Sequence, residues 1–491
     1  MNPNTAEIVA KLWKECKTLQ SAGVSYSNYV NELTYLLFLK MLEETKQENR
    51  LPNGHNWSRL AGLEGGDQLD YYKKMLLELG NAKETHDPVV LAIFTDAMTH
   101  LRLPKDLKTL TTNIDKLDWF SAREDGLGDL YEGLLEKTTS ATKSKAGQYF
   151  TPRALIDSII RLVKPQPGET VQDPAAGTGG FLIAADRYVK DHTDELFALS
   201  ESQGHFQRRS AFVGHEWVPD THRLCVMNMI LHGIESLVGC EDSCAPQGEH
   251  LGKADVILTN PPFNKMSGNT NRPDFSVTAG ERVGPMPFLE HAIRSLKPGG
   301  RCAIVMPDNI LFGDGTGTEL RRFLMINCNL HTILRLPTGI FYAQGVKTNV
   351  MFFTRVTDEI LPAEYDSSET KKVWFYDLRT NMPSFGKTNA LTSKHFEEFE
   401  ELFGEDPKGN APRAELGEES RWRSLTRDQI AERGDNLDWT WLRDESGDPE
   451  DEMTEPDDIA AAIVGHLRAA LEEIEALTEE LEEAPVVEAA E

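Results

Sequence analysis

Cysteine is scarce in this chain, and the spacing of a zinc site is missing. Only six cysteines are scattered through 491 residues. Cys240 and Cys244 lie close together, but no second pair with the spacing of zinc ligands follows them. We therefore expect no metal site, and we interpret as buried free thiols Cys16, Cys225, Cys240, Cys244, Cys302 and Cys328.

Long apolar runs are missing as well. A helix that spans a bilayer needs roughly 18 or more apolar residues in succession. The most apolar block, from Leu33 to Leu42, is shorter and contains Thr34, Tyr35 and Lys40. No signal peptide is recognisable in the first residues. These absences predict a cytoplasmic protein with no membrane partner.

The chain also lacks the excess of basic residues with which proteins hold duplex DNA by themselves. Its 51 basic and 79 acidic residues give a net charge of −28. Residues 444–491 contain 18 acidic residues and the single base Arg468, which is −17 of the total −28. The other 443 residues are still acidic, at −11, so any work on DNA would favour a basic partner that supplies the grip.

The most informative stretch is Thr170 to Phe181, which reads Thr-Val-Gln-Asp-Pro-Ala-Ala-Gly-Thr-Gly-Gly-Phe. It predicts a short strand that ends on an acid, a turn of small residues and a helix start. Because Gly177, Gly179 and Gly180 have no side chain, a bulky ligand can lie against the backbone there. Such turns typically hold a nucleotide-type cofactor through backbone amides and a helix N-terminus. The dinucleotide pattern Gly-x-Gly-x-x-Gly is missing, and an ordinary tight turn is the alternative for this loop alone.

A second stretch, Ala254 to Phe263, reads Ala-Asp-Val-Ile-Leu-Thr-Asn-Pro-Pro-Phe. Val256 to Leu258 is an apolar run typical of a strand buried on both faces of a parallel sheet. Two prolines then end the strand and leave a stiff backbone with free carbonyls. The amide oxygen of Asn260 and the flat ring of Phe263 suit a planar group that carries an amino group. An ordinary proline turn is the alternative for these residues alone.

An acid also ends the predicted strand from Ala211 to Glu216. At that place, the carboxyl of Glu216 can accept both ribose hydroxyls of an adenosine, while a surface acid at a strand end is the alternative. All three features lie at the carboxyl ends of predicted parallel strands, where open α/β sheets bind ligands.

These motifs resemble those of a known family. Asp173 to Phe181 resembles the S-adenosylmethionine motif of DNA methyltransferases, and Asn260 to Phe263 resembles the catalytic motif of enzymes that methylate the exocyclic amine of adenine. Gly147 to Arg153, Gly-Gln-Tyr-Phe-Thr-Pro-Arg, resembles the segment that closes over the methionine end of the cofactor. The order of the motifs, the helical leader and the length are similar to those of the modification subunit of type I restriction–modification systems, over nearly the whole chain.

The resemblance implies S-adenosylmethionine as the cofactor and assigns roles to individual residues. The catalytic residues it implies are Asn260, Pro261, Pro262 and Phe263. The cofactor-binding residues it implies are Gln148, Tyr149, Phe150, Thr151, Pro152, Arg153, Asp173, Ala175, Gly177, Thr178, Gly179, Gly180, Glu216 and Asp242. Around Asp242 the chain departs from the Gly-Asp of many relatives, and Asp255 is expected to be structural.

The implied reaction is methyl transfer to N6 of adenine. An adenine within a duplex hides its amino group, so the base must be flipped out at a cost of about a few kcal/mol. Phe263 would stack on the base, while the Asn260 amide oxygen and the Pro261 carbonyl accept from its amino group. The nitrogen then attacks the methyl group directly, without a covalent enzyme intermediate. Positioning would be the main contribution of the protein, since the cofactor supplies the reactive group.

The order of elements predicts an α/β fold, namely a Rossmann-like S-adenosylmethionine-dependent methyltransferase sheet of about seven mostly parallel strands with helices on both faces. Residues 1–135 read as a helical domain, in which Ser25 or Ser27 caps a helix. Residues 140–435 read as the methyltransferase domain, and residues 140–145 as the hinge into it. Residues 238–242 are an ambiguous short strand. The polar segment from Phe263 to Pro287 is typical of a mobile functional loop.

The C-terminal residues predict a docking element. Residues 444–458 read as an acidic linker, and residues 459–484 as a coiled-coil-like helix. Leu467, Ile474 and Leu481 are seven residues apart, which is typical of a coiled-coil seam. By resemblance the partner is a specificity subunit that reads the DNA sequence, with two copies of this chain for each. A restriction (endonuclease/translocase) subunit would complete the complex, and methylation would protect host DNA from it.

Other functions remain open at this point. A protein glutamine N5-methyltransferase can use the same Asn-Pro-Pro arrangement, but such enzymes generally have Tyr in place of Phe263 and lack the helical leader. Enzymes that methylate the exocyclic nitrogen of cytosine usually have Ser in place of Asn260. A non-catalytic assembly subunit with a methyltransferase fold is a third possibility, and the intact motifs argue against it.

Overall fold

The computed structural model describes residues 9–14, 24–117, 119, 127–141, 151–263, 268–341, 347–365, 367–383, 385 and 389–443. Several predicted features lie outside these residues: Cys16, Gln148, Tyr149, Phe150, the hinge beyond Ala141, the acidic linker and the C-terminal docking helix.

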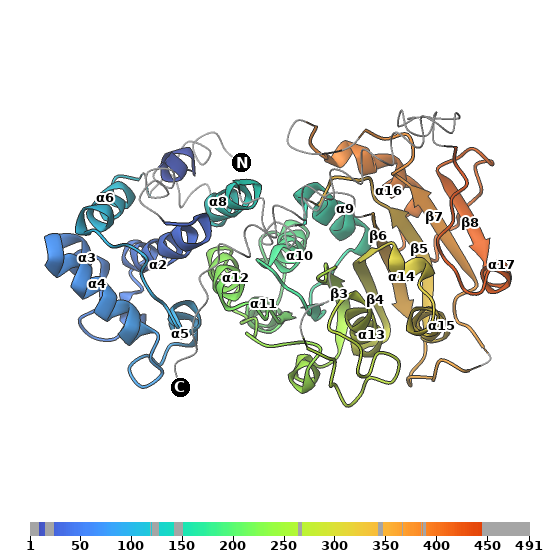
Figure 1. Cartoon of the computed structure of the whole chain (residues 1–491), viewed down its shortest axis with the longest axis horizontal. Helices are drawn as coiled ribbons and strands as arrows, with labels where there is room; N and C mark the ends of the chain where they lie inside the picture. Colours follow the sequence, from blue (N-terminus) through green and yellow to red (C-terminus); the bar gives the residue numbers. More distant parts are fainter. Residues whose placement is uncertain are drawn as a thin grey trace, which may run out of the picture.

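An N-terminal helical region, drawn in blue to teal in Figure 1, precedes the sheet. Its helices are α2 (Tyr26–Glu44), η1 (Glu48–Arg50), α3 (Trp57–Gly62), α4 (Gly65–Leu79), α5 (Pro88–Phe94), α6 (Pro104–Asp115) and α8 (Leu127–Ala141). Ser25 caps α2, as one of the two predicted alternatives requires, and its side chain accepts a hydrogen bond from the backbone N–H of Asn28 at 3.2 Å. The apolar residues of α2 are buried because α2 lies in the core of this region.

The rest of the described chain is built on one eight-stranded sheet in the order β2-β1-β3-β4-β6-β5-β7-β8. The strands are β1 (Val171–Asp173), β2 (Phe212–Gly214), β3 (Ala254–Thr259), β4 (Leu296–Pro307), β5 (Cys328–Arg335), β6 (Thr348–Arg355), β7 (Lys372–Asp377) and β8 (Trp422–Thr426). The helices of this part are α9 (Arg153–Val163), α10 (Gly180–Asp191), α11 (Glu201–Arg209), α12 (Pro219–Leu231), η3 (Pro246–Leu251), α13 (Pro285–Ser295), α14 (Asn309–Phe312), α15 (Thr316–Asn327), η4 (Ser393–Phe396), α16 (Glu397–Phe403) and α17 (Arg427–Glu432).

The predicted α/β class is confirmed, and the sheet is mostly parallel as expected, with β6 and β8 as the reversed strands. Strands β1, β2, β3 and β4 are parallel, whereas β6 runs antiparallel to both β4 and β5, and β8 runs antiparallel to β7. β8 is an additional strand that the sequence pattern missed. The ambiguous strand at residues 238–242 does not form, since only Gly239 bridges to His215 there.

Proline and glycine usually interrupt regular elements, but Pro298-Gly299-Gly300 lies within β4, which follows α13 directly from Leu296. The pairing with β3 shifts instead, because Ala254 lies opposite Leu296 and Val256 opposite Arg301. The Pro-Gly-Gly segment is thus an irregularity within the strand.

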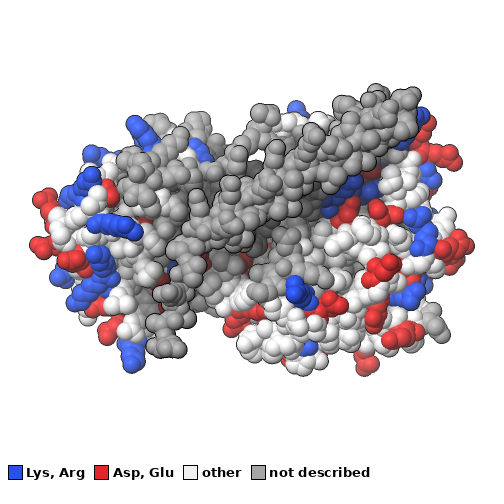
Figure 2. Space-filling model, in the orientation of Figure 1, with Lys and Arg blue, Asp and Glu red and all other residues white. Residues whose placement is uncertain are grey.

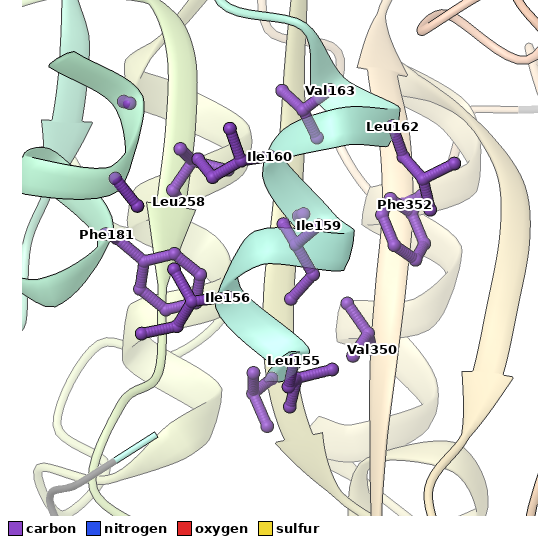
Figure 3. Packing of buried hydrophobic residues seen from close by; sticks show 14 of the residues in the cluster. Leu155, Ile156, Ile159, Ile160, Leu162, Val163, Phe181, Leu258, Val350 and Phe352 are labelled. Carbon is purple, nitrogen blue, oxygen red and sulfur yellow. The ribbon is translucent and has the colours of Figure 1, made fainter. Parts of the chain in front are cut away.

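Helices cover both faces of the sheet, and this makes the strands apolar along their length. One face packs against α9, α10 and α16, and the other packs against α13, α14, α15 and α17. Figure 3 shows α9 with Ile156, Ile159 and Ile160 in the same buried cluster as Phe181 of α10 and Leu258 of β3. Helix α9 therefore packs against the helix that follows the Gly-rich turn and against the strand that leads to Asn260.

Helix α12 lies between the helical region and the sheet, as Figure 1 shows. Its Cys225 and Met229 belong to the core beside the sheet, whereas Val226 and Met227 belong to the core of the helical region. Arg223 donates hydrogen bonds to the carbonyl oxygens of Ile93 and Thr95, at the end of α5. The two parts are therefore packed through one shared helix.

The described surface carries charges of both signs. On the face shown in Figure 2, Lys and Arg are interspersed with Asp and Glu, and neither sign covers a continuous area of the described residues. None of the helices in the described ranges is long and apolar enough to cross a membrane.

The cysteines of the described ranges are free thiols, as predicted. Burial holds for four of them, namely Cys225, Cys244, Cys302 and Cys328. The prediction is wrong for Cys240, which is exposed because it lies in the turn after the single bridge at Gly239.

Candidate active site

The Gly-rich turn follows β1 and is shaped by the last residue of that strand, Asp173. Its Oδ1 accepts hydrogen bonds from the backbone N–H of Ala175 at 3.0 Å and from the hydroxyl of Thr259 at 2.7 Å. Because Thr259 ends β3, this carboxyl connects the turn to the strand that leads into Asn260. Burial raises the pKa of Asp173 to about 7. Asp173 thus links the two motifs predicted from the sequence.

Two glycines of the turn have backbone conformations that other residues rarely adopt. Gly177 has a φ of 55° and Gly179 a φ of 83°, both in the left-handed region. Gly179 is the N-cap of α10, and no side chain caps that helix. The N–H groups at the start of α10 are therefore suited to bind an anionic group.

Glu216 lies against the same turn. Its Oε2 accepts from the backbone N–H of Gly177 at 2.9 Å, and its Oε1 accepts from that of Val218 at 2.8 Å. Burial raises the pKa of Glu216 to about 7. Each carboxyl oxygen can accept a further hydrogen bond, so Glu216 is able to receive the hydroxyls of a ligand.

A pocket of ≈ 520 Å³, measured with its open mouth, lies over this carboxyl; we call it the Glu216 pocket. It is lined by Pro174, Ala175, Gly177, His215, Glu216, Trp217, Val218, Glu241, Asp242, Ser243, Asn260, Pro262, Val283 and Phe288. The pocket brings together six of the predicted site residues: Ala175, Gly177, Glu216, Asp242, Asn260 and Pro262.

Three apolar residues of the Glu216 pocket were missed by the sequence reasoning. The large side chain of Trp217 is 45% exposed to solvent. Val283 and Phe288 are buried and line the pocket. Together they offer apolar surface to a flat ring. Trp217 could have been found, because it directly follows the predicted acid. Val283 and Phe288 come from a distant loop and helix, and no local signal marks them.

A second and smaller pocket, the Asp173 pocket, continues from the first. Its lining residues are Thr151, Ile156, Asp173, Ala175, Ala176, Thr178, Gly180, Phe181 and Asn260. Ala175 and Asn260 line both pockets, so Asn260 lies where the two meet.

The side chain of Asn260 has one satisfied end and one unsatisfied end. Its Nδ2 donates to the hydroxyl of Thr151 at 2.9 Å, whereas its Oδ1 is buried with no hydrogen-bond partner. A buried acceptor without a partner costs about 1–3 kcal/mol. Such a cost is expected at a functional site, where a ligand supplies the missing donor.

Phe263 and Phe341 form an aromatic pair next to Asn260. Their ring centroids are 5.4 Å apart and their planes are at 90°. Phe341 is buried and lies in the segment between β5 and β6, which sequence reasoning did not connect with the site. Pro261 is buried, while Phe263 is partly exposed.

The segment that precedes α9 is described from Thr151 onward. Thr151 is buried and lines the Asp173 pocket, and Pro152 is the N-cap of α9. Arg153 is exposed and forms an ion pair with Glu132 of α8. The other predicted members of this segment, Gln148, Tyr149 and Phe150, lie outside the described residues.

The segment after Phe263 was expected to be a mobile loop, but residues 268–284 are held by buried polar contacts. The guanidinium of Arg272 donates to the Ser243 carbonyl at 3.1 Å and to Nδ1 of His291 at 2.6 Å. His291 is fully buried, and burial and the Arg272 charge lower its pKa well below the usual value. The neutral ring then donates from Nε2 to Gln172 Oε1 of β1 at 2.7 Å. This loop is fixed to the strand that carries Asp173.

Asp242 and Asp255 lie in different surroundings. Asp242 lines the Glu216 pocket, and its Oδ1 accepts from the backbone N–H of Cys244 at 2.8 Å. Asp255 accepts from the backbone N–H of Thr170 and from Nζ of Lys297, so it connects the amino ends of neighbouring strands and is structural, as expected.

Comparison with known proteins identifies the family. A family model described as N-6 DNA Methylase matches residues 122–445, and one described as HsdM N-terminal domain matches residues 8–137. The chain is 47% identical to the type I restriction enzyme EcoKI methylase subunit of Escherichia coli (strain K12), over 97% of this chain and 96% of that protein. It is also 47% identical to the StySJI methylase subunit of Salmonella typhimurium (strain LT2), with the same coverage.

Solved structures agree with this assignment. The crystal structure of the EcoKI M protein is 44% identical in sequence, covers 98% of this chain and 97% of its own, and superposes with a TM-score of 0.57. A chain from a study of complex assembly and conformational transition of the type I R-M system is 26% identical, covers 98% and 99%, and gives a TM-score of 0.71. The chain therefore belongs to the N-6 DNA methylase family, among the type I restriction enzyme methylase subunits, which are adenine-specific DNA methyltransferases.

Proposed function

We propose that this chain transfers the methyl group of S-adenosylmethionine to N6 of an adenine flipped out of its DNA site. The observation that carries the proposal is the buried Oδ1 of Asn260, which has no partner and lies where two pockets meet. An exocyclic amine approaching from the pocket mouth is the kind of donor that this oxygen lacks.

The two pockets suit the two ends of the cofactor. The Glu216 pocket offers a carboxyl for ribose hydroxyls and the rings of Trp217 and Phe288 for the adenine base. The Asp173 pocket, with the N-terminus of α10 at its edge, offers N–H donors for the methionine end. When bound, the cofactor supplies an electrophilic methyl group at the junction beside Asn260.

The residues of this chain then position the target amine. Asn260 Oδ1 and the carbonyl of Pro261 accept its two hydrogens, which directs the nitrogen lone pair toward the methyl group. Thr151 fixes the orientation of the Asn260 amide, because its hydroxyl oxygen accepts from Nδ2. Phe263 turns from its edge contact with Phe341 to stack on the base. Catalysis is then positioning of two reactants.

The assembly is part of the same proposal. A specificity subunit would read the DNA sequence and hold two copies of this chain, and a restriction subunit would complete the complex. Similar proteins are methylase subunits of type I restriction enzymes, and one similar structure comes from a study of complex assembly in a type I R-M system. The net negative charge of this chain favours a partner that supplies the basic residues for binding DNA.

We further propose that residues 1–135 and 140–435 are separate domains. Residues 459–484 would dock onto the partner, and the complex would work in the cytoplasm.

The test is transfer of labelled methyl from S-adenosylmethionine to unmethylated DNA, with and without the co-expressed specificity subunit. Label on adenine that requires this subunit is the expected result. Asn260→Ala should abolish transfer while S-adenosylhomocysteine still binds, because it removes only the acceptor for the amine. Asn309→Ala, at an exposed position after β4, is the control and should be active. Full activity of Asn260→Ala would exclude the proposed role, and label on a protein glutamine would favour the alternative.

A further inference from the structure

A third pocket lies between the helical region and the Gly-rich turn, and no role in the reaction assigned above uses it. We call it the Glu132 pocket, because Glu132 of α8 lies in its wall. Glu136 of the same helix also lines it, as do Arg153 of α9 and Arg187 of α10. The helical region thus contributes two acids to a pocket whose other walls belong to the sheet region.

The Glu132 pocket is continuous with the site already described. Thr151, Ile156, Thr178 and Gly180 line both it and the Asp173 pocket. The three pockets therefore follow one another, from Trp217 and Glu216, past Asn260, to Glu132. A ligand whose nucleoside fills the first and whose sulfur lies beside Asn260 directs its amino-acid tail toward the third.

A second observation indicates that the Glu132 pocket receives a donor. Asn228 of α12 lines it and is 1% exposed. Its Nδ2 donates to the carbonyl of Thr178 at 2.9 Å, and its Oδ1 is buried without a hydrogen-bond partner. As with Asn260, an acceptor in this state is costly unless a ligand completes it.

The charges around this acceptor have the arrangement that an amino acid requires. The carboxylate of Glu132 and Oδ1 of Asn228 are acceptors for an ammonium group. Arg153 and the uncapped N-terminus of α10 are donors for a carboxylate. Without a ligand, Glu132 and Arg153 neutralise one another in an ion pair.

We propose that Glu132 of the helical region, with Asn228 and Arg153, binds the α-amino and α-carboxyl groups of the cofactor's methionine moiety. This rests on the proposed use of S-adenosylmethionine and adds that the helical region completes the cofactor site. Cofactor binding then replaces the Glu132–Arg153 ion pair with two ion pairs to the ligand. Occupancy of the site and the ion-pair contact between α8 and α9 are thereby linked.

The test compares two ligands that differ only at this end. S-adenosylhomocysteine carries the amino acid, whereas 5′-methylthioadenosine has the same nucleoside and a thioether but no amino or carboxyl group. In the full chain, Glu132→Gln should weaken binding of S-adenosylhomocysteine roughly tenfold or more, the size of one charge-assisted hydrogen bond, and leave binding of 5′-methylthioadenosine unchanged. Unchanged binding of the short ligand also shows that the variant is folded.

The control removes another ion pair between an acidic residue and an arginine of α9. Glu400 pairs with Arg161 of α9 away from the Glu132 pocket, so Glu400→Gln should leave the ratio of the two affinities unchanged. If Glu132→Gln weakens both ligands equally, or lowers only the melting temperature, Glu132 is a structural contact and the inference is overturned. If the unaltered chain binds neither ligand, the proposed cofactor itself is wrong, which is a distinct outcome.

Discussion

At the scale of single residues, two carboxyls beside the Gly-rich turn have similarly raised pKa values but lie in different pockets. Burial raises the pKa of both Asp173 and Glu216 to about 7. Oδ1 of Asp173 accepts hydrogen bonds from the backbone N–H of Ala175 and from the hydroxyl of Thr259, and the second of these connects β1 to β3. Glu216 instead lines the wider pocket, where a ligand reaches it. Because the ribose is proposed to bind at Glu216, we expect nucleoside binding to change the ionisation of this carboxyl.

Binding of S-adenosylhomocysteine should depend on the protonation of Glu216. Below pH 7 the carboxyl is protonated in the free protein, and it must lose that proton to accept from two ribose hydroxyls. Affinity should thus weaken as the pH falls below about 7, by at most about tenfold per pH unit for one proton. Isothermal titration calorimetry at several pH values measures this. Glu216→Gln should bind more weakly at high pH and lose most of the dependence, and an unaltered dependence would assign the proton to another group.

Thr151 should act as a positioning residue through Asn260. Thr151→Val removes the oxygen that accepts from Nδ2 of Asn260 while keeping nearly the same shape. Loss of one hydrogen bond of about 1 kcal/mol predicts a fall of roughly five- to tenfold in kcat, with a smaller change in KM for the cofactor. Steady-state methylation kinetics separate the two constants. Thr151→Ser keeps the hydroxyl and should retain activity; if it is as impaired as Thr151→Val, the methyl group of Thr151 matters rather than its oxygen.

At the scale of elements, the loop at residues 268–284 shows how an irregular segment becomes part of the site wall. Glu290 of α13 accepts hydrogen bonds from the backbone N–H groups of Ser276, Val277 and Thr278. Arg272 connects the loop to Ser243, which lines the Glu216 pocket. The loop therefore holds Val283 at the pocket through contacts to a neighbouring helix and to the turn after Asp242.

Arg272→Ala should release this loop and destabilise the protein. It leaves the Ser243 carbonyl and Nδ1 of His291 without their donor in a buried place, at a cost of roughly 3 kcal/mol. Hydrogen exchange should increase over residues 268–284, and the denaturation midpoint should fall. Arg282→Ala, at an exposed position in the same loop, is the matched control and should change neither. Equal exchange in both variants would contradict the anchoring role of Arg272.

The sequence predicted those elements whose signals are local. The Gly-rich turn, Glu216 and Asn260 each follow a short apolar strand, so a local pattern marks each of them. β8 was missed because its alternation is weak, with Arg423 and Ser424 between apolar residues. The reversal of β6 could not be seen either, since strand direction depends on the connection rather than on the residues of the strand. Phe341 and Glu132 were missed because their positions beside the site depend on contacts across the fold.

At the scale of the whole molecule, α12 decides how the helical region and the sheet region are joined. Arg223 is 3% exposed, and its guanidinium lies 5.2 Å from the centroid of the Tyr35 ring in α2. It donates to the Ile93 carbonyl at 2.7 Å and the Thr95 carbonyl at 2.9 Å, at the C-terminal end of α5. The sequence of α12 gave no hint of this, because apolar residues on all its sides indicate only that it is buried. Since α12 also contacts the Gly-rich turn through Asn228, movement of the helical region would reach the site.

Arg223→Ala should therefore uncouple the two parts of the molecule. The carbonyls of Ile93 and Thr95 lose their donor, and each unsatisfied buried carbonyl costs about 1–3 kcal/mol. Calorimetry should resolve two unfolding transitions where the unaltered chain shows one, because the shared helix no longer makes the two cores cooperative. Arg209→Ala removes an exposed ion pair with Glu235 from the sheet region and should preserve the single transition. A single transition at lower temperature in Arg223→Ala would mean that the apolar contacts of Val226 and Met227 suffice to couple the parts, and the polar bridge would then contribute stability without transmitting motion to the site.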